Sequence, residues 1–228
     1  MPVPTIYWIS GSAPAWRVLL SLEFKNVKYQ SHILQTSKKE QKENWFLSIN
    51  PRGQIPVLKD GETVVTESQA ILRYLEMKFP EPALFGSSPR ESAAIEQSIQ
   101  EILGYCDPAL SAFIQPVFRN QIDQHRTDLP DIGKTIKSEL TSIENKIGNT
   151  STPWIAGEFT AADIMLIPTI QRLLRAIKKE PEVAVEINLG DFDSRYPGLG
   201  AWNSAVESLP IFKNTYPPHW KEADLADC

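Results

Sequence analysis

Hydrophobic and polar residues follow two different patterns along this chain. Up to about residue 80, short β-forming runs at 5–10, 28–34, 55–58 and 63–65 alternate with helical segments that begin at Ala15, Ser37 and Ser68. The resulting order, β-α-β-α-β-β-α, predicts an α/β domain with one mixed sheet over residues 1–82.

The second half of this domain predicts a hairpin followed directly by a helix. Asp60-Gly61 lies between two β-forming runs, which is typical of a tight hairpin turn. Ser68 then precedes a helical stripe, with Glu67 just before it, so we expect Ser68 to be the N-cap. The apolar positions of that stripe are Ile71, Leu72, Leu75 and Phe79.

Strand signals are scarce beyond a Pro-containing linker at 80–89, and residues 90–228 predict an all-helical domain. The clearest stripe recurs every three or four residues from Ile132 to Ile147. Thr160 and Asp163 have the spacing of a capping box, so we expect both to stabilise a helix start and to take no part in chemistry. Pro108 and Pro116 should kink or end the helix that contains them.

Composition narrows the function classes. The 228 residues carry a net charge of −5, which argues against a nucleic-acid partner. The two cysteines, Cys106 and Cys228, form neither a disulfide framework nor a zinc-ligand spacing. The N-terminus has no signal-peptide pattern, and no apolar run approaches the ~20 residues of a membrane helix. A cytoplasmic protein without membrane attachment is expected.

The stretch from Asn50 to Leu58 suggests a binding site. An X–Pro bond at Ile55-Pro56 adopts the cis form at low cost, and this would turn the backbone of Ile55 toward a ligand. The helix start at Glu67-Ser68 offers free N–H groups and a hydroxyl to a carboxylate. Together these features favour a small peptide ligand.

The same residues carry a resemblance to a known family. The motif N-P-x-G-Q-I-P-V-L, the hairpin, and E-S-x-A-I-x-x-Y-L resemble the glutathione-binding domain of cytosolic glutathione transferases. The resemblance covers nearly the whole chain and implies a thioredoxin-like first domain. The sequence has no Cys-x-x-Cys near the first strand, so disulfide exchange is not expected. The combination S-G-S-x-P-x-W-R-V, N-P-R-G-Q and a terminal Y-P-P-x-W is most similar to the Rho class.

The resemblance also implies roles for single residues. Ile55 would bind the cysteinyl part of glutathione through its backbone, while Glu67 and Ser68 would hold the γ-glutamyl amine and carboxylate. Gln54 would add an amide contact, and Lys42 would reach the glycyl carboxylate. Gln41 departs from Phi-type sequences, which carry His there, and this weakens the assignment of Lys42.

For the catalytic residue, the resemblance favours Ser12 as the hydroxyl that stabilises the glutathione thiolate. Ser12 follows the first strand and precedes a helix, where backbone N–H groups point outward. Its alternative role is that of a simple N-cap. Ser10 is a rival donor, and Tyr7 is a third candidate by analogy with tyrosine-dependent classes, although it lies within the expected strand. Zeta-type and Omega-type chemistry are disfavoured, because Ala13 and Pro14 follow Ser12 and no cysteine precedes Cys106.

The function implied is a glutathione transferase that conjugates reduced glutathione to hydrophobic electrophiles, in the manner of detoxification enzymes. Glutathione is then a co-substrate, no cofactor or metal is needed, and a homodimer is expected, with the helical domain forming the electrophile site. The alternative is a non-catalytic module of the same fold, or a ligandin-type carrier of apolar molecules.

Overall fold

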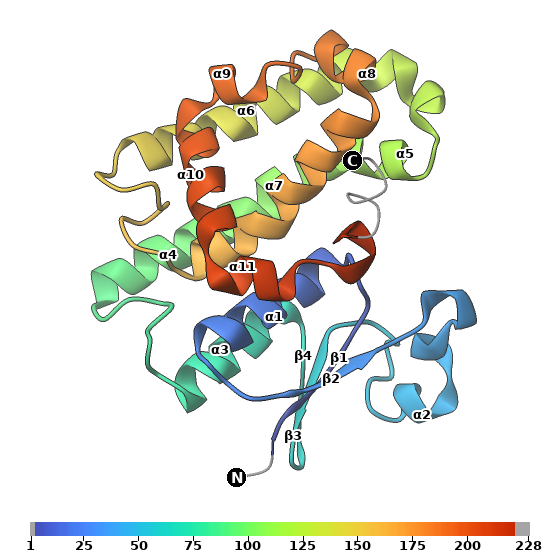
Figure 1. The fold of residues 1–228 in the computed structure, drawn as a ribbon, viewed down its shortest axis with the longest axis vertical. Helices are drawn as coiled ribbons and strands as arrows, with labels where there is room; N and C mark the ends of the chain where they lie inside the picture. Colours follow the sequence, from blue (N-terminus) through green and yellow to red (C-terminus); the bar gives the residue numbers. More distant parts are fainter. Residues whose placement is uncertain (1–2, 222–228) are drawn as a thin grey trace. The chain divides into compact units, whose positions relative to one another are not determined.

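The structure, a computed structural model, describes residues 3–221. The chain divides into two compact units (Figure 1). Among the described residues, one unit comprises 3–83 together with 209–221, and the other comprises 84–208. The expected helical domain extended from residue 90 to the end, so the structure differs in placing the final segment with the α/β unit.

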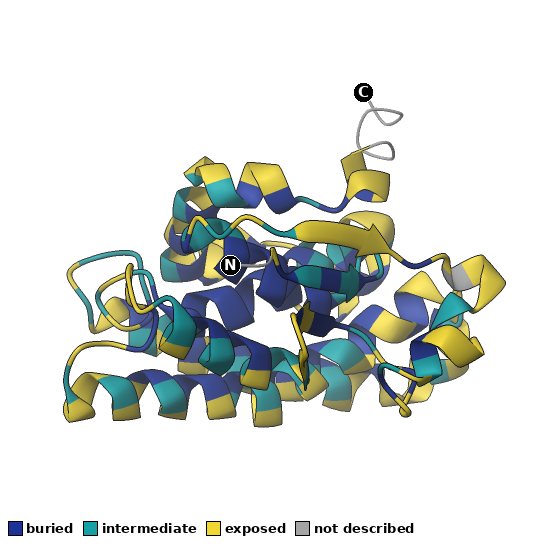
Figure 2. Cartoon of the chain, turned by 90° about the horizontal axis from the view of Figure 1, so that it is seen from below, coloured by how far each residue is buried: buried dark blue, intermediate teal, exposed yellow. Residues whose placement is uncertain are grey.

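The first unit contains the expected mixed sheet. Its strands are β1 (Thr5–Trp8), β2 (Gln30–Ile33), β3 (Val57–Asp60) and β4 (Thr63–Thr66). The spatial order is β2-β1-β3-β4, with β1 parallel to β2 and the other pairs antiparallel. Gly61 has a φ of 61° in the β3–β4 turn, so the Asp-Gly hairpin is confirmed. β2 forms an edge whose four residues are all exposed, drawn in yellow in Figure 2.

Helices cover both faces of this sheet. α1 (Ala13–Phe24) and α3 (Ser68–Lys78) pack against each other, and α3 also contacts β3 and β4. On the opposite face, Phe46 of α2 (Asn44–Leu47) packs with Leu34 and Val57. The βαβαββα architecture predicted from the pattern is confirmed.

One expected helix is broken. The polar segment at 37–49 forms two 3₁₀ turns, Thr36–Lys38 and Glu40–Lys42, before the short α2. Lys39 has a φ of 54° between these turns, a left-handed conformation that an α-helix cannot contain. The prediction of a continuous helix there was therefore wrong.

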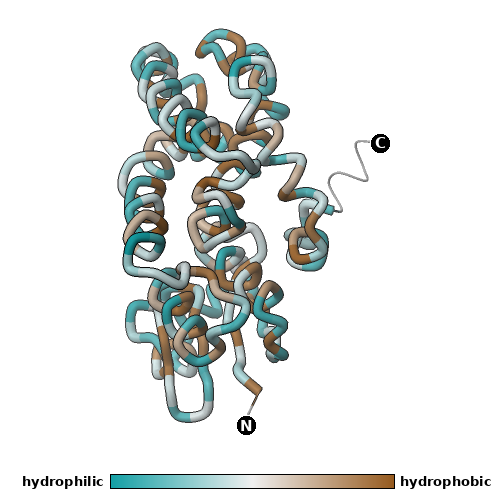
Figure 3. Tube along the Cα trace, turned by 90° about the vertical axis from the view of Figure 1, so that its left-hand side faces the viewer, coloured by the Kyte–Doolittle hydropathy of each residue, from teal (hydrophilic) through white to brown (hydrophobic). Residues whose placement is uncertain are grey.

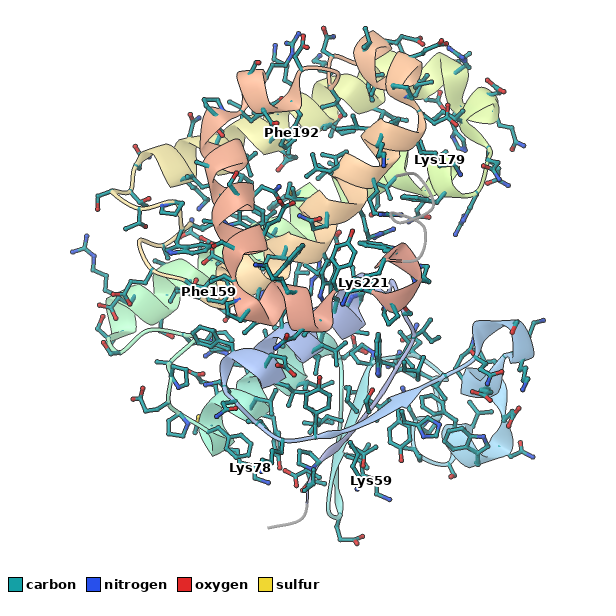
Figure 4. All side chains as sticks on the ribbon, viewed as in Figure 1. Lys59, Lys78, Phe159, Lys179, Phe192 and Lys221 are labelled. Atoms are coloured by element: carbon teal, nitrogen blue, oxygen red, sulfur yellow. The ribbon has the colours of Figure 1, made fainter. Side chains whose placement is uncertain are left out.

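A buried polar group attaches α3 to the sheet. The Tyr74 hydroxyl donates to Asp60 Oδ2 at 2.8 Å, and the ammonium of Lys78, labelled in Figure 4, pairs with the same oxygen. Burial opposes the charged form of Asp60, but the hydrogen bonds from Lys78 and Tyr74 outweigh it and lower the pKa of the carboxyl.

The returning C-terminal segment packs on α1. Trp16 lies within 5.5–5.8 Å, between ring centroids, of Phe212, Tyr216 and Trp220. Its indole N–H donates to Thr215 Oγ1 at 2.9 Å, at the end of α11 (Pro210–Thr215). The sequence pattern did not predict α11.

The second unit is helical, with brown and teal positions alternating along its helices in Figure 3. Its helices are α4 (Pro89–Glu101), α5 (Asp107–Phe118), α6 (Leu129–Gly148), α7 (Ala161–Lys179), α8 (Pro181–Glu186), α9 (Phe192–Arg195) and α10 (Pro197–Ser208). A π-helical turn joins α4 to α5, and a 3₁₀ segment, Ile122–Asp128, precedes α6.

Two local expectations in this unit have different outcomes. The capping box of Thr160 and Asp163 is confirmed at the start of α7. We expected Pro108 and Pro116 to kink or end their helix. Pro108 lies in the first turn of α5, just after the π-helical turn, where a proline is tolerated. Pro116 lies inside α5, which ends two residues later. Among the described residues, no helix combines the length and apolar character needed to span a membrane.

Candidate glutathione site in the α/β unit

The strand directions bring three loops that carry candidate residues to the same end of the sheet. Paired residues form a row across it, His32, Tyr7, Val57 and Thr66. Because β1 and β2 are parallel while β3 and β4 are antiparallel to their neighbours, β1, β2 and β4 end, and β3 begins, at this same end of the sheet. The β1–α1 turn, the residues before Pro56 and the Glu67-Ser68 junction therefore lie close together.

The β1–α1 turn presents two serines. Ser12 N donates to Ile9 O at 3.2 Å, which closes a turn with Ser10 and Gly11 at its centre. Gly11 has a φ of 79°, the left-handed conformation that the third position of such a turn favours. Ser12 is the N-cap of α1, and its Oγ accepts the N–H of Ala15 at a long 3.4 Å. Accepting this bond leaves the hydroxyl proton of Ser12 available for donation.

The two rival donors have different surroundings. Ser10 Oγ shares a hydrogen bond of 2.7 Å with Nδ1 of His219, in the C-terminal segment. Tyr7 packs on the α2 face of the sheet, with its ring 6.0 Å from that of Phe46. Among the three candidates, Ser12 is the one placed at the helix start.

The loop before β3 is held in shape by Asn50. This buried side chain donates to Gln54 O at 2.8 Å and accepts the N–H of Arg52 at 3.2 Å. The Ile55-Pro56 bond is cis, and the pairing of β3 with β1 begins only at Val57. Ile55 thus lies outside the strand ladder, while the side chain of Gln54 is exposed.

Lys42 lies beside the same loop. Its Nζ donates to Arg52 O at 3.2 Å, and the side chain is exposed. Gly53, with a φ of 58°, makes this approach possible, because a Cβ there would lie 2.6 Å from Gln41 O and 2.9 Å from Lys42 Nζ. The structure therefore brings Lys42 to the loop that contains Gln54.

The Glu67-Ser68 junction differs from the expectation in one detail. α3 begins at Ser68, and the N-cap is Glu67, so the prediction of Ser68 as N-cap was wrong. Glu67 has φ 65° and ψ 120°, a conformation that costs energy for a residue with a side chain and recurs at binding sites. Within residues 3–221, neither a capping bond from Glu67 nor a partner for the Ser68 hydroxyl occurs.

Two contributors were missed by sequence reasoning. Asn50 belongs to the motif that carries the family resemblance. A polar residue between an apolar helix end and a turn often makes hydrogen bonds within the turn, so its role could have been predicted. His219 lies more than 200 residues from Ser10, and nothing in the local sequence indicates their contact. In the described part of the chain, His, Cys, Asp and Glu form no group suited to a metal ion.

Comparison with known proteins gives one family. Residues 11–78 match the model "Glutathione S-transferase, N-terminal domain", and residues 117–202 match "Glutathione S-transferase, C-terminal domain". The chain is 31% identical to glutathione S-transferase A of Pleuronectes platessa, over 96% of this chain and 93% of the relative. It is 34% identical to glutathione S-transferase DHAR2 of Arabidopsis thaliana, over 72% and 68%.

A solved structure agrees with this assignment. The glutathione S-transferase of the Antarctic clam Laternula elliptica superposes with a TM-score of 0.84 at 32% identity, covering 97% of this chain and 95% of that one. Both family models and near full-length relatives thus match the α/β unit with its helical partner. This chain belongs to the glutathione S-transferase family.

Proposed function

We propose that this glutathione transferase conjugates reduced glutathione to hydrophobic electrophiles and that the Ser12 hydroxyl stabilises the thiolate. The observation that carries this proposal is the shared end of the sheet, where Ser12 at the start of α1 lies with the cis-Pro loop and the start of α3. A sulfur anion in this position would meet a hydroxyl donor and the positive end of a helix.

The energetic demand on the site is modest. A free thiol has a pKa of about 8.5, so only a few per cent is ionised at neutral pH. Lowering this pKa by about two units requires roughly 2.7 kcal/mol of preference for the thiolate. One hydrogen bond to a charged sulfur and the dipole of α1, which is 12 residues long, together can supply this amount.

Glutathione is a peptide with two carboxylates and one ammonium group, and the candidate residues match these groups. The backbone of Ile55 would pair with the cysteinyl unit as an added strand does. Glu67 would hold the γ-glutamyl ammonium, and Ser68 with the free N–H groups of α3 would hold its carboxylate. Gln54 and Lys42 would reach the glycyl end.

Location and assembly are part of the proposal. We propose a cytoplasmic setting, because glutathione reacts as a free thiol and a free thiol persists in a reducing compartment. A homodimer is proposed because two-fold pairs are the commonest oligomers and the family is usually dimeric. Light scattering at micromolar concentration measures this directly, and a monomer mass would contradict it.

The decisive experiment combines binding and turnover on the same preparation. Calorimetry measures the heat of glutathione binding, and a panel of electrophiles measures conjugation. Binding together with turnover is the expected result. Binding without turnover on any electrophile would favour the non-catalytic module, and the absence of binding at millimolar glutathione would contradict the proposal altogether.

A further inference from the structure

The β1–α1 turn also holds a hydroxyl–imidazole pair. Ser10 Oγ and His219 Nδ1 are 2.7 Å apart, within the range of a nucleophile and its base in enzymes. Both residues line an open cavity of about 370 Å³, together with Ile9, Ile33 and Leu34. Ile9 and Leu34 also belong to the cluster on which Ile55 packs, so this cavity adjoins the loop proposed to bind the cysteinyl unit.

His219 is fixed in this place by more than one contact. A Cβ on Gly11 would come within 2.7 Å of its Cε1, so the imidazole rests against a position that only glycine allows. The neighbouring Trp220 packs edge-on against Trp16 in the core of the unit. The orientation of the imidazole toward Ser10 is thus set by the fold of the C-terminal segment.

We propose that this pair receives the proton that glutathione loses when its thiol ionises. The S–H bond breaks as its proton passes to Ser10 Oγ, while the Ser10 hydroxyl proton passes to Nδ1 of His219. The products are a thiolate and an imidazolium, so charge and atoms balance. After the thiolate attacks the electrophile, the imidazolium returns the proton to the leaving group or to solvent.

This role differs from that of Ser12. Ser12 stabilises the thiolate by donating a hydrogen bond, whereas His219 determines where the proton goes and acts through Ser10. His219 is therefore a positioning and proton-accepting residue. Imidazole is the side chain best suited to accept a proton at neutral pH, and Ile9, Ile33 and Leu34 of the same cavity carry no titratable group. The inference rests on the proposed function.

The test compares thiolate formed with protons released when glutathione binds at about pH 7, where an ordinary imidazole is largely neutral. Ultraviolet absorbance counts thiolate, and calorimetry in two buffers of different ionisation enthalpy counts protons released to solvent. For the wild type, we expect fewer protons released than thiolates formed, because the negative charge of the nearby thiolate favours the imidazolium form of His219, with up to about one proton retained per site.

Two variants remove the acceptor in different ways. In His219→Asn the side-chain amide keeps a hydrogen bond to Ser10 but does not titrate, and in Ser10→Ala the relay is missing while the C-terminal segment is untouched. In both we expect proton release to equal thiolate formation. The kcat of conjugation should fall by about 10²-fold, the lower end of general-base contributions, with KM for glutathione unchanged. His32→Asn, an exposed histidine of β2, is the matched control.

The outcomes separate the two hypotheses. If thiolate forms in the wild type and every proton appears in solvent, the proton-acceptor role is overturned and the proposed function stands. If both variants still retain the proton, the acceptor is another group and this role is again overturned. If the wild type forms no thiolate at all, both proposals are overturned together.

Discussion

Trp202 of α10 donates its indole N–H to Oδ1 of Asp163 at 2.9 Å, in the core of the helical unit. The same carboxylate accepts the N–H of Ile155 at 3.1 Å and that of Thr160 at 2.9 Å. Asp163 is fully buried, so the capping box that starts α7 also joins α10 and the loop before α7. The residue that marks the helix start in the sequence therefore also holds separate segments of the helical unit together. The neighbouring Phe159, labelled in Figure 4, packs edge-on against Trp154 in that loop.

Asp163→Ala should lower the free energy of unfolding by at least about 2 kcal/mol, because several buried donors lose their acceptor at once. Turnover per folded molecule should stay unchanged. Urea denaturation measures the first quantity and active-site-normalised kinetics the second. Asp131→Ala, at an exposed position in the first turn of α6, is the control and should change stability by no more than about 0.5 kcal/mol. Normal stability with abolished turnover would place Asp163 in the catalytic machinery instead.

The same carboxyl should make stability depend on pH. Burial raises the pKa of Asp163 to about 6, against the hydrogen bonds that favour its charged form. Between the unfolded value near 4 and about 6, the folded chain binds more protons than the unfolded chain, so this contribution to stability decreases as pH rises.

Asp163→Asn removes this titration. The free energy of unfolding of the wild type, taken relative to that of the variant, should decrease as pH rises through that window and stay constant above it. Denaturation at a series of pH values measures both quantities. A difference that does not vary with pH would show that the carboxyl keeps its ordinary pKa in the fold.

Ser12→Ala should leave glutathione affinity nearly intact, because the proposed backbone and carboxylate contacts remain. The pKa of the bound thiol should rise toward its free value, and kcat near neutral pH should fall by roughly 10- to 10³-fold, as when one oriented donor is removed. At high pH the defect should shrink, because the thiol then ionises without help. Thiolate absorbance against pH measures the effect. Ser12→Thr keeps both hydroxyl and cap and should behave as wild type; an unchanged titration in Ser12→Ala would exclude Ser12 as the donor.

Ser68→Ala should weaken glutathione binding by about 1–3 kcal/mol, the usual contribution of a hydrogen bond to a charged group. Stability should not change, because the hydroxyl has no partner among residues 3–221. Calorimetry measures the affinity and urea denaturation the stability. Ser138→Ala, exposed on α6, is the control. Unchanged affinity would remove Ser68 from the site.

Thr215→Val should destabilise the α/β unit by about 1–3 kcal/mol, because the buried indole N–H of Trp16 loses its acceptor. Thr215→Ser keeps the hydroxyl, which also donates to Ile211 O at 2.7 Å, and should stay close to wild type. Urea denaturation of both variants distinguishes them. Equal stability of the two would mean that the C-terminal segment does not depend on this bond.

The sequence by itself determined the parts of this protein that depend on local periodicity and turn chemistry. The four strands, the Asp60-Gly61 hairpin, the stripe of α6 and the capping box at Thr160 were predicted because neighbouring residues specify them. The pattern also predicted one mixed sheet, but the spatial order and the directions of its strands, which bring the candidate loops to the same end of the sheet, come from the structure.

Only the tertiary structure decided where the C-terminal segment lies and what it contacts. The predicted boundary assigned that segment to the helical domain, because helical periodicity carries no information about the surface on which a helix packs. The partners of Trp16, Ser10 and Asp163 are Thr215, His219 and Trp202, which lie 199, 209 and 39 residues away. Such contacts arise when separate elements bury their surfaces together, and a local pattern cannot specify them.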